Sequence, residues 1–158
     1  MSYHIDLQKA TEAQIPVSDE CLISWAKLPL LSHKKSAELT LRLVEAEEIT
    51  ELNHNYRKQN KATNVLAFPT LLPEGIELEY PLLGDVIICP SVLQAESLEQ
   101  GTALDAHWAH IVIHGVLHLL GYDHIKESDA ELMQELEITL LAKLGFDNPY
   151  QREGDHVE

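Results

Sequence analysis

The order of the expected strands and helices constrains the fold more than any other feature of the sequence. In the first half of the chain apolar residues alternate with polar ones, as in half-buried strands, and after Pro90 they recur at helical spacing. Strands followed by helices disfavour a repeating βαβ fold. We predict an α+β fold: a single domain over residues 1–158, a small mixed sheet of about four strands packed with helices, and a flexible tail at about 147–158.

Turn and capping residues predict where these elements begin and end. Four strands are expected, near residues 3–7, 39–43, 64–68 and 84–89. Five helices are expected, near residues 18–27, 47–56, 91–99, 103–120 and 127–144. Ser18 is a suitable N-cap for the first helix. Residues 70–83, with two prolines and a glycine, are expected to be irregular.

The charge of the chain limits its partners. The formal net charge is −15, from 26 acidic and 11 basic residues, which disfavours loose adhesion to nucleic acids and anionic membranes. Arg57, Lys58 and Lys61 fall within five residues and form the one cationic cluster suited to phosphate. Any binding of RNA is therefore expected to be local and to involve this cluster.

The cysteines and the N-terminus favour a cytoplasmic protein. Cys21 and Cys89 are far apart and belong to no C-x-x-C pair, so they predict neither a disulfide framework nor a thiolate metal site. Residues 1–10 lack the basic and apolar regions of a signal peptide, and no apolar run has the length of a membrane span.

Three histidines near the end of the fourth expected helix have the spacing of a metal site. Successive helical residues turn by about 100°, so His114 and His118 share one face. Gly121 can end the helix and let the chain turn back, which allows His124 to complete the site. Three histidines with a fourth position open to water are typical of catalytic zinc. We therefore predict a metal-dependent hydrolase with the metal on this helix and the following turn.

The same spacing occurs in the metzincin peptidases, with one informative difference. Their signature, H-E-x-x-H-x-x-G-x-x-H, has a glutamate as general base directly after the first histidine. This chain has Gly115 there, which disfavours the peptidase mechanism. His107 and His110 lie on the same helical arc and could be outer-shell or substrate-facing groups, whereas the remaining histidines are expected to be ordinary surface residues. These are His4, His33, His54 and His156.

Three segments together resemble the YbeY family of bacterial endoribonucleases. The eleven residues from His114 to His124 resemble its histidine signature, and Leu83, Gly84 and Asp85 resemble another of its motifs. The remaining motif is matched by Leu52, Asn53, Tyr56 and Arg57, followed by the run from Thr63 to Pro69. The similarity extends from about Glu38 to Tyr150, while the first forty residues fit only by pattern.

The resemblance implies a zinc-dependent, single-strand-specific endoribonuclease in 16S rRNA 3′-end maturation and ribosome quality control. One Zn²⁺ per chain would be held by His114, His118 and His124. Arg57 would act on the reacting phosphate, because a guanidinium can bind it bidentately and stabilise developing charge. The implied partners are ribosomal RNA and the small ribosomal subunit, reached through ribosomal proteins and an assembly GTPase, with no membrane and no DNA.

Other site roles follow less directly. Lys58 and Lys61 are expected to bind substrate with Arg57, and Asp123 and Asp85 are the candidates for proton transfer. Asp123 could instead orient His124, and Asp85 could simply cap a turn. The chain also departs from the family pattern where Lys, Asp, Pro and Ser are more usual, which predicts a less basic RNA groove. These positions are Gln59, Asn60, Ala62 and Ala67.

Two other functions are compatible with the sequence. A zinc peptidase or other small metal-dependent hydrolase is supported by the histidine spacing and opposed by Gly115. A non-catalytic ribosome-assembly factor with a structural metal is supported by the strong acidity, because a chain with a charge of −15 is poorly suited to bind free RNA.

Overall fold

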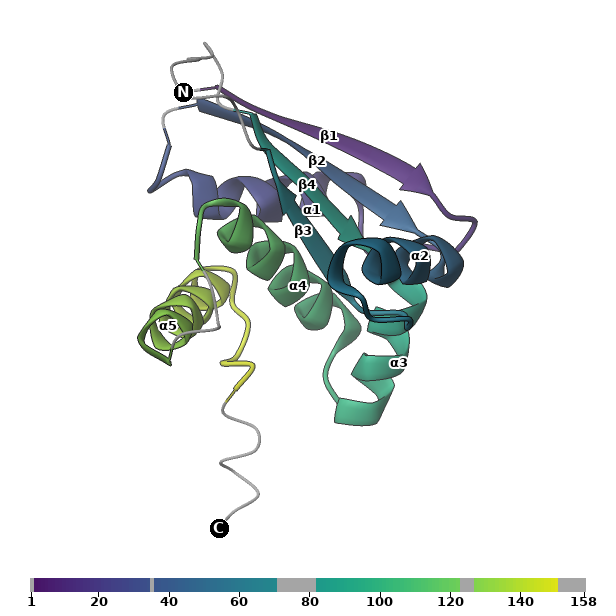
Figure 1. The fold of residues 1–158 in the computed structure, drawn as a ribbon. Helices are drawn as coiled ribbons and strands as arrows, with labels where there is room; N and C mark the ends of the chain where they lie inside the picture. The colour runs from purple at the N-terminus through teal and green to yellow at the C-terminus, as the bar shows by residue number, and fades with distance from the viewer. Residues whose placement is uncertain (1, 35, 71–81, 123–126, 151–158) are drawn as a thin grey trace.

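The protein is an α+β structure with a mixed sheet, as the sequence predicts (Figure 1). The computed structural model describes residues 2–34, 36–70, 82–122 and 127–150. The strands are β1 (Ser2–Ala10), β2 (Ser36–Val44), β3 (Val65–Pro69) and β4 (Leu82–Ile88). The helices are α1 (Asp19–Lys27), η1 (Leu28–Leu30, a 3₁₀ turn), α2 (Ala46–Arg57), α3 (Pro90–Gln100), α4 (Leu104–Leu119) and α5 (Glu127–Lys143). Within these ranges, no helix is both long and apolar enough to cross a membrane.

The four strands form one sheet in the order β1-β2-β4-β3. β1, β2 and β4 are parallel, and β3 pairs with β4 in the antiparallel direction at the edge. A register shift between Glu38 and Leu39 of β2 lies opposite the start of β4. Gly84 takes up this irregularity with φ of +137°, and a Cβ atom there would lie 2.1 Å from the carbonyl oxygen of Phe68. Only glycine fits at this irregular position of the strand.

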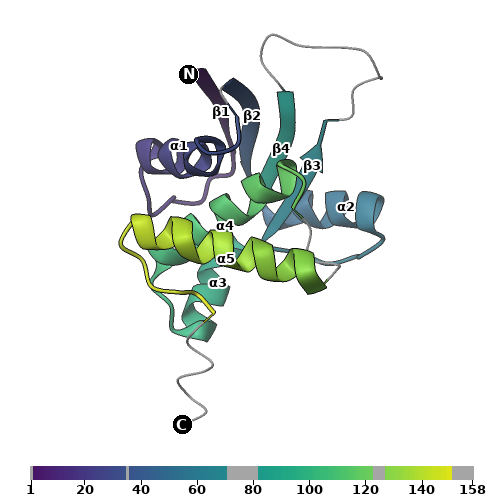
Figure 2. The same cartoon turned by 90° about the vertical axis from the view of Figure 1, so that its left-hand side faces the viewer.

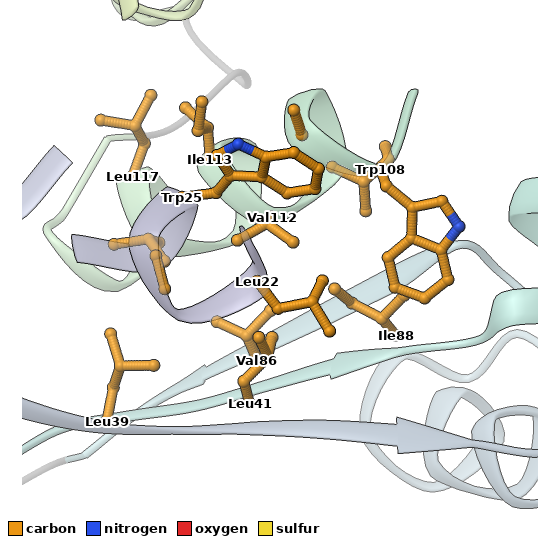
Figure 3. Packing of buried hydrophobic residues seen from close by; sticks show 14 of the residues in the cluster. Leu22, Trp25, Leu39, Leu41, Val86, Ile88, Trp108, Val112, Ile113 and Leu117 are labelled. Atoms are coloured by element: carbon orange, nitrogen blue, oxygen red, sulfur yellow. The ribbon is translucent and has the colours of Figure 1, made fainter. Parts of the chain in front are cut away.

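Alternating side chains of the sheet enter two apolar layers. In β4, Val86 and Ile88 join the larger layer with α1, α4 and α5, whereas Ile87 packs on the other face with Ile49 of α2. Figure 3 shows side chains from α1 and α4 meeting those of β2 and β4 in the larger layer. Both faces of the sheet are therefore partly covered. Successive residues of a strand point to opposite faces, so neighbours such as Val86 and Ile87 enter different layers.

Helix α4 is the central support of the larger layer. It contacts β3 and β4 on one side and α5 on the other, and it also packs against α1 and α3 (Figures 1 and 2). Its buried residues include Trp108, Val112 and Val116. A helix that is covered on several sides needs apolar residues on each of them, as the sequence of α4 has. The first helix begins where the sequence predicts, because the Ser18 side chain accepts a hydrogen bond from the Cys21 backbone N–H at 3.1 Å.

Candidate active site

Four histidines follow one another along one side of α4. The ring centroids of His107 and His110 are 6.4 Å apart, and those of His110 and His114 are 6.2 Å apart. His114 and His118 are closer, with centroids separated by 4.6 Å. We call these four residues the histidine row. The pair His114 and His118, which the sequence places on one helical face, therefore has its two imidazoles side by side.

Gly115 brings this part of α4 close to the sheet. A Cβ atom at Gly115 would lie 2.6 Å from Cγ1 of Val86 and 3.3 Å from Cγ2 of Val65. Real side chains do not tolerate the shorter distance, so the close contact between α4 and the sheet requires glycine. A glutamate here would point into the buried layer beside β4. The position that would carry the general base of a metzincin peptidase is therefore a packing contact in this protein.

Glu137 of α5 joins two members of the histidine row. Its side chain is 1% exposed. One carboxylate oxygen, Oε2, accepts a hydrogen bond from Nδ1 of His114 at 2.6 Å, and the other, Oε1, accepts from Nε2 of His110 at 2.8 Å. The hydroxyl of Tyr150 also donates to Oε1. We call Glu137, His110, His114 and Tyr150 the Glu137 network.

The hydrogen bonds of the network determine its charge. Burial raises the pKa of Glu137, but hydrogen bonds from His110 and His114 and electrostatic interactions with them outweigh burial and lower the pKa to about 2. Burial raises the pKa of Tyr150, and its hydrogen bond to Glu137 raises it further. At neutral pH the network therefore contains a carboxylate and a neutral phenol that donates to it.

The network also contains atoms that could bind a metal ion. The potential ligand atoms of His110, His114 and Glu137 all lie within 4.8 Å of one another. His118 lies beside His114 on the side away from His110. This stretch of α4 can therefore offer imidazole ligands to a metal, with an ionised carboxylate directly behind one of them.

His107, at the other end of the histidine row, belongs to a separate polar cluster. It is 6% exposed, and its Nε2 lies 2.9 Å from Oε1 of Glu96 in α3. The Asn64 amide donates to both oxygens of Glu96, at 3.2 and 3.3 Å. The cluster thus connects α3, α4 and the residue that precedes β3, a position suited to holding elements together.

The predicted phosphate-binding cations lie at the end of α2. Arg57 is the last residue of this helix, and Lys58 is its C-cap with φ of +60°. Both side chains are exposed, as is that of Lys61, whose carbonyl accepts a hydrogen bond from the Asn53 amide at 3.0 Å. In the described part of the chain, neither a hydrogen bond nor an ion pair connects these cations to the histidine row.

Asp85 lies on the face of the sheet opposite to α4. It is exposed on β4 and pairs with Phe68, whose side chain packs in the layer that includes α2. Its neighbour Val86 faces α4, so the Asp85 side chain points to the opposite face of the sheet. His124 and Asp123, the other predicted residues of the motif, lie outside the described residues.

One histidine contradicts its predicted role. His33, expected to be an ordinary surface residue, is half-buried, with its Nδ1 2.7 Å from the Pro29 carbonyl oxygen and its Nε2 2.7 Å from the Tyr122 hydroxyl. The carbonyl requires a proton on Nδ1, so Nε2 of the neutral ring accepts from Tyr122. This contact attaches the turn after α4 to the segment after η1. His4 and His54 are exposed as expected, and His156 is outside the described range.

Glu137 was missed because the end of the chain is rich in acids. It is one of five acidic residues in α5, and two of the others, Glu131 and Glu135, are exposed. A signal was nevertheless present: Glu137 lies four residues after Met133 and three before Leu140, on the helical face that carries buried apolar residues. A lone acid at such a position needs a buried partner. Tyr150 lies within the range predicted as a flexible tail, and no sequence pattern predicts its contact with Glu137.

Comparisons with known proteins identify the relatives of the chain. A family model described as endoribonuclease YbeY matches residues 7–145. An endoribonuclease YbeY of Legionella pneumophila is 60% identical over 158 residues, covering 100% of both chains. One of Pseudomonas putida is 51% identical over 146 residues, covering 92% of each. The solution structure of a Thermotoga maritima protein has the same fold, with a TM-score of 0.57, 24% identity, and coverage of 92% of this chain and 99% of that one.

Proposed function

Since the chain belongs to the endoribonuclease YbeY family, we propose that it is a zinc-dependent endoribonuclease that cuts single-stranded RNA. Its proposed roles are 16S rRNA 3′-end maturation and ribosome quality control. The observation that carries this proposal is the pair of adjacent imidazoles on α4, His114 and His118, backed by the buried carboxylate of Glu137. It is the arrangement expected of imidazole ligands with an outer partner.

The residues that would hold the metal are His114, His118 and His124, with one zinc ion per chain. The donor chemistry fits, because His114 and His118 are neighbouring imidazoles and His114 is hydrogen-bonded through Nδ1 to an anion. A bound zinc ion would supply Lewis-acid chemistry, polarising a phosphoryl oxygen and making water a nucleophile near neutral pH. The hydrogen bond from His114 to Glu137 would orient the ring for such a ligand role.

The basic residues at the end of α2 would bind the RNA. Arg57 is proposed to contact the reacting phosphate, and Lys58 and Lys61 to contact neighbouring phosphates. All three are exposed, so they are accessible to a polyanion. Asp123 and Asp85 are proposed as proton-transfer groups. For Asp85, the proposal requires RNA to reach the face of β4 that it shares with Phe68.

The proposed setting is the bacterial cytoplasm. The partners would be ribosomal RNA and the small ribosomal subunit, with ribosomal proteins and an assembly GTPase providing contacts that the acidic chain cannot make with free RNA. The net charge of −15 supports this, because only a local cationic surface such as Arg57, Lys58 and Lys61 attracts phosphate. Protein contacts would then supply much of the specificity.

The proposal is tested by measuring zinc content and RNA cleavage together. Wild type, His114→Ala and Arg57→Glu would be analysed for zinc and then incubated with a single-stranded small-subunit rRNA precursor or with casein, with and without chelator. We expect chelator-sensitive cleavage of RNA only. His114→Ala should lose both zinc and cleavage, whereas Arg57→Glu should keep zinc and lose about 100-fold or more in cleavage rate, the cost of removing a group that stabilises transition-state charge.

A matched control and two contrary outcomes complete the test. Lys143→Glu reverses an exposed cation in the last turn of α5 and should leave cleavage unchanged. Zinc-dependent cleavage of casein would indicate a peptidase. Normal rRNA ends in cells whose only copy carries Arg57→Glu, still folded and ribosome-associated, would indicate a non-catalytic assembly factor.

A further inference from the structure

We propose that Glu137 is a positioning residue that makes His114 bind metal through Nε2, and that His110 and Tyr150 hold Glu137 in place for this purpose. The inference rests on the proposed function in one respect, that His114 is a metal ligand. It adds a carboxylate from α5 and a phenol from residue 150 to a site otherwise built on α4 and the following turn. Residue 150 lies beyond the segment matched by the family model.

The contact between Glu137 and His114 determines which nitrogen carries the proton. Oε2 of Glu137 lies 2.6 Å from Nδ1 of His114. A carboxylate can only accept a hydrogen bond, so Nδ1 must carry a hydrogen. A neutral imidazole protonated on Nδ1 has its lone pair on Nε2. The ring therefore has only Nε2 to offer a metal, and the charge behind it increases the basicity of that nitrogen.

The rest of the network keeps the carboxylate from turning. Oε1 accepts from Nε2 of His110 at 2.8 Å and also from the Tyr150 hydroxyl. The Tyr150 ring packs edge-on against His110, with centroids 5.5 Å apart. The two carboxylate oxygens thus accept hydrogen bonds from different donors, and the Glu137 side chain is 1% exposed. Rotating the group would break hydrogen bonds that water cannot replace, so the oxygen facing His114 is fixed.

The alternative is that Glu137, His110 and His114 themselves hold the ion, and the distances oppose it. Nδ1 of His114 and Oε2 of Glu137 are 2.6 Å apart. Two donors on a tetrahedral zinc, each about 2.0–2.1 Å from the metal, lie roughly 3.3 Å from one another. The observed separation is that of a short charge-assisted hydrogen bond, with a proton between the atoms. If Nδ1 and Oε2 were both ligand atoms, the metal would bind the opposite nitrogen of His114 and displace this proton.

Zinc bound to Nε2 of His114 and zinc bound to Nδ1 give different ¹⁵N NMR signals, so they can be distinguished without RNA. In ¹⁵N NMR of the zinc-loaded wild type, with histidine signals assigned by substitution, we expect His114 to show a protonated Nδ1 and a zinc-bound Nε2. Glu137→Gln should still bind one zinc per chain, with an affinity 10- to 100-fold lower, as is usual when an outer partner is removed. A glutamine has one acceptor oxygen for three donors, so it cannot replace the carboxylate.

Two further variants separate positioning from a general effect on folding. Tyr150→Phe removes one donor and should lower zinc affinity by less than about 10-fold, with Nε2 coordination retained. Glu135→Gln changes an exposed acid on the same helix and should leave zinc affinity unchanged. If Glu137→Gln does not fold, the nitrogen assignment in wild type and in Tyr150→Phe still tests the inference.

The inference is overturned if zinc binds Nδ1 of His114, if Glu137→Gln binds zinc as tightly as wild type, or if His114 is not a ligand at all. Failure of the proposed activity would look different. Suppose that zinc binds Nε2 of His114 and that Glu137→Gln lowers zinc affinity as expected, but that RNA is not cleaved. This result would support the positioning role of Glu137 and refute the proposed nuclease activity.

Discussion

The two ends of the histidine row use the same kind of contact, a histidine hydrogen-bonded to a glutamate, for different purposes. At one end Glu96 of α3 accepts from His107, and at the other Glu137 of α5 accepts from His110 and His114. The Glu96 side chain is 28% exposed and that of Glu137 is 1% exposed. The remaining donor to Glu96 is the amide of Asn64, whereas for Glu137 it is the phenol of Tyr150.

This difference shows that a His–Glu contact does not by itself identify a site. Glu96 and Asn64 connect three elements, and the Asn64 carbonyl also accepts the Cys89 backbone N–H at 3.1 Å, so this end of the row stabilises the fold. Glu137 instead holds His114 beside a second imidazole, that of His118. What separates the two ends is how close the next imidazole on α4 lies: the ring centroids of His114 and His118 are 4.6 Å apart, and those of His107 and His110 are 6.4 Å apart.

The largest expected effect comes from a substitution at the close contact between the sheet and α4, the helix that carries both ends of the row. Gly115→Glu would place a side chain 2.6 Å from Val86 and bury a carboxylate, so it should lower the free energy of unfolding by about 3 kcal/mol or more. Urea denaturation measures this change. Ala142→Glu, at an exposed position of α5, should change it by less than about 0.5 kcal/mol. A stable Gly115→Glu protein would show that α4 does not need its close contact with the sheet.

A smaller effect should separate the two ends directly. His107→Ala removes a buried hydrogen bond to a carboxylate and should lower the free energy of unfolding by about 2 kcal/mol, while zinc bound per folded chain is unchanged. Denaturation and elemental analysis of the same samples would show this. His54→Ala, an exposed histidine of α2, should change neither quantity. Loss of zinc in His107→Ala would mean that the whole row, and not one end, forms the metal site.

The smallest effect is expected in acid. The pKa of Glu137 is lowered from 4.5 to about 2, so its contribution to stability is present above pH 4.5 and is lost as the pH falls toward 2. The free energy of unfolding of the metal-free protein should therefore fall more steeply over this range in wild type than in Glu137→Gln. Urea titrations at several pH values would test this. Equal slopes in the two proteins would show that the carboxylate does not depend on its histidine partners.

Several features could be predicted from the sequence because they depend on neighbours along the chain. The strands, the helices and the N-cap at Ser18 follow from apolar spacing and local hydrogen bonding, and the structure confirms them. The α+β class follows from their order. His114 and His118 share a helical face for the same local reason. The family resemblance also needs only the sequence, since its motifs are short and continuous.

Other features were decided by tertiary structure, because they depend on residues far apart in sequence. Glu137 lies 23 residues from His114, and its place on the apolar face of α5 does not by itself identify the partner that it meets when α5 packs on α4. Asp85 is placed on the face opposite α4 by the register of β4, and His33 meets Tyr122 across 89 residues. Gly115 could be seen as a missing base, but only the packed sheet shows the reason for it: the space that a side chain would need is occupied by Val86.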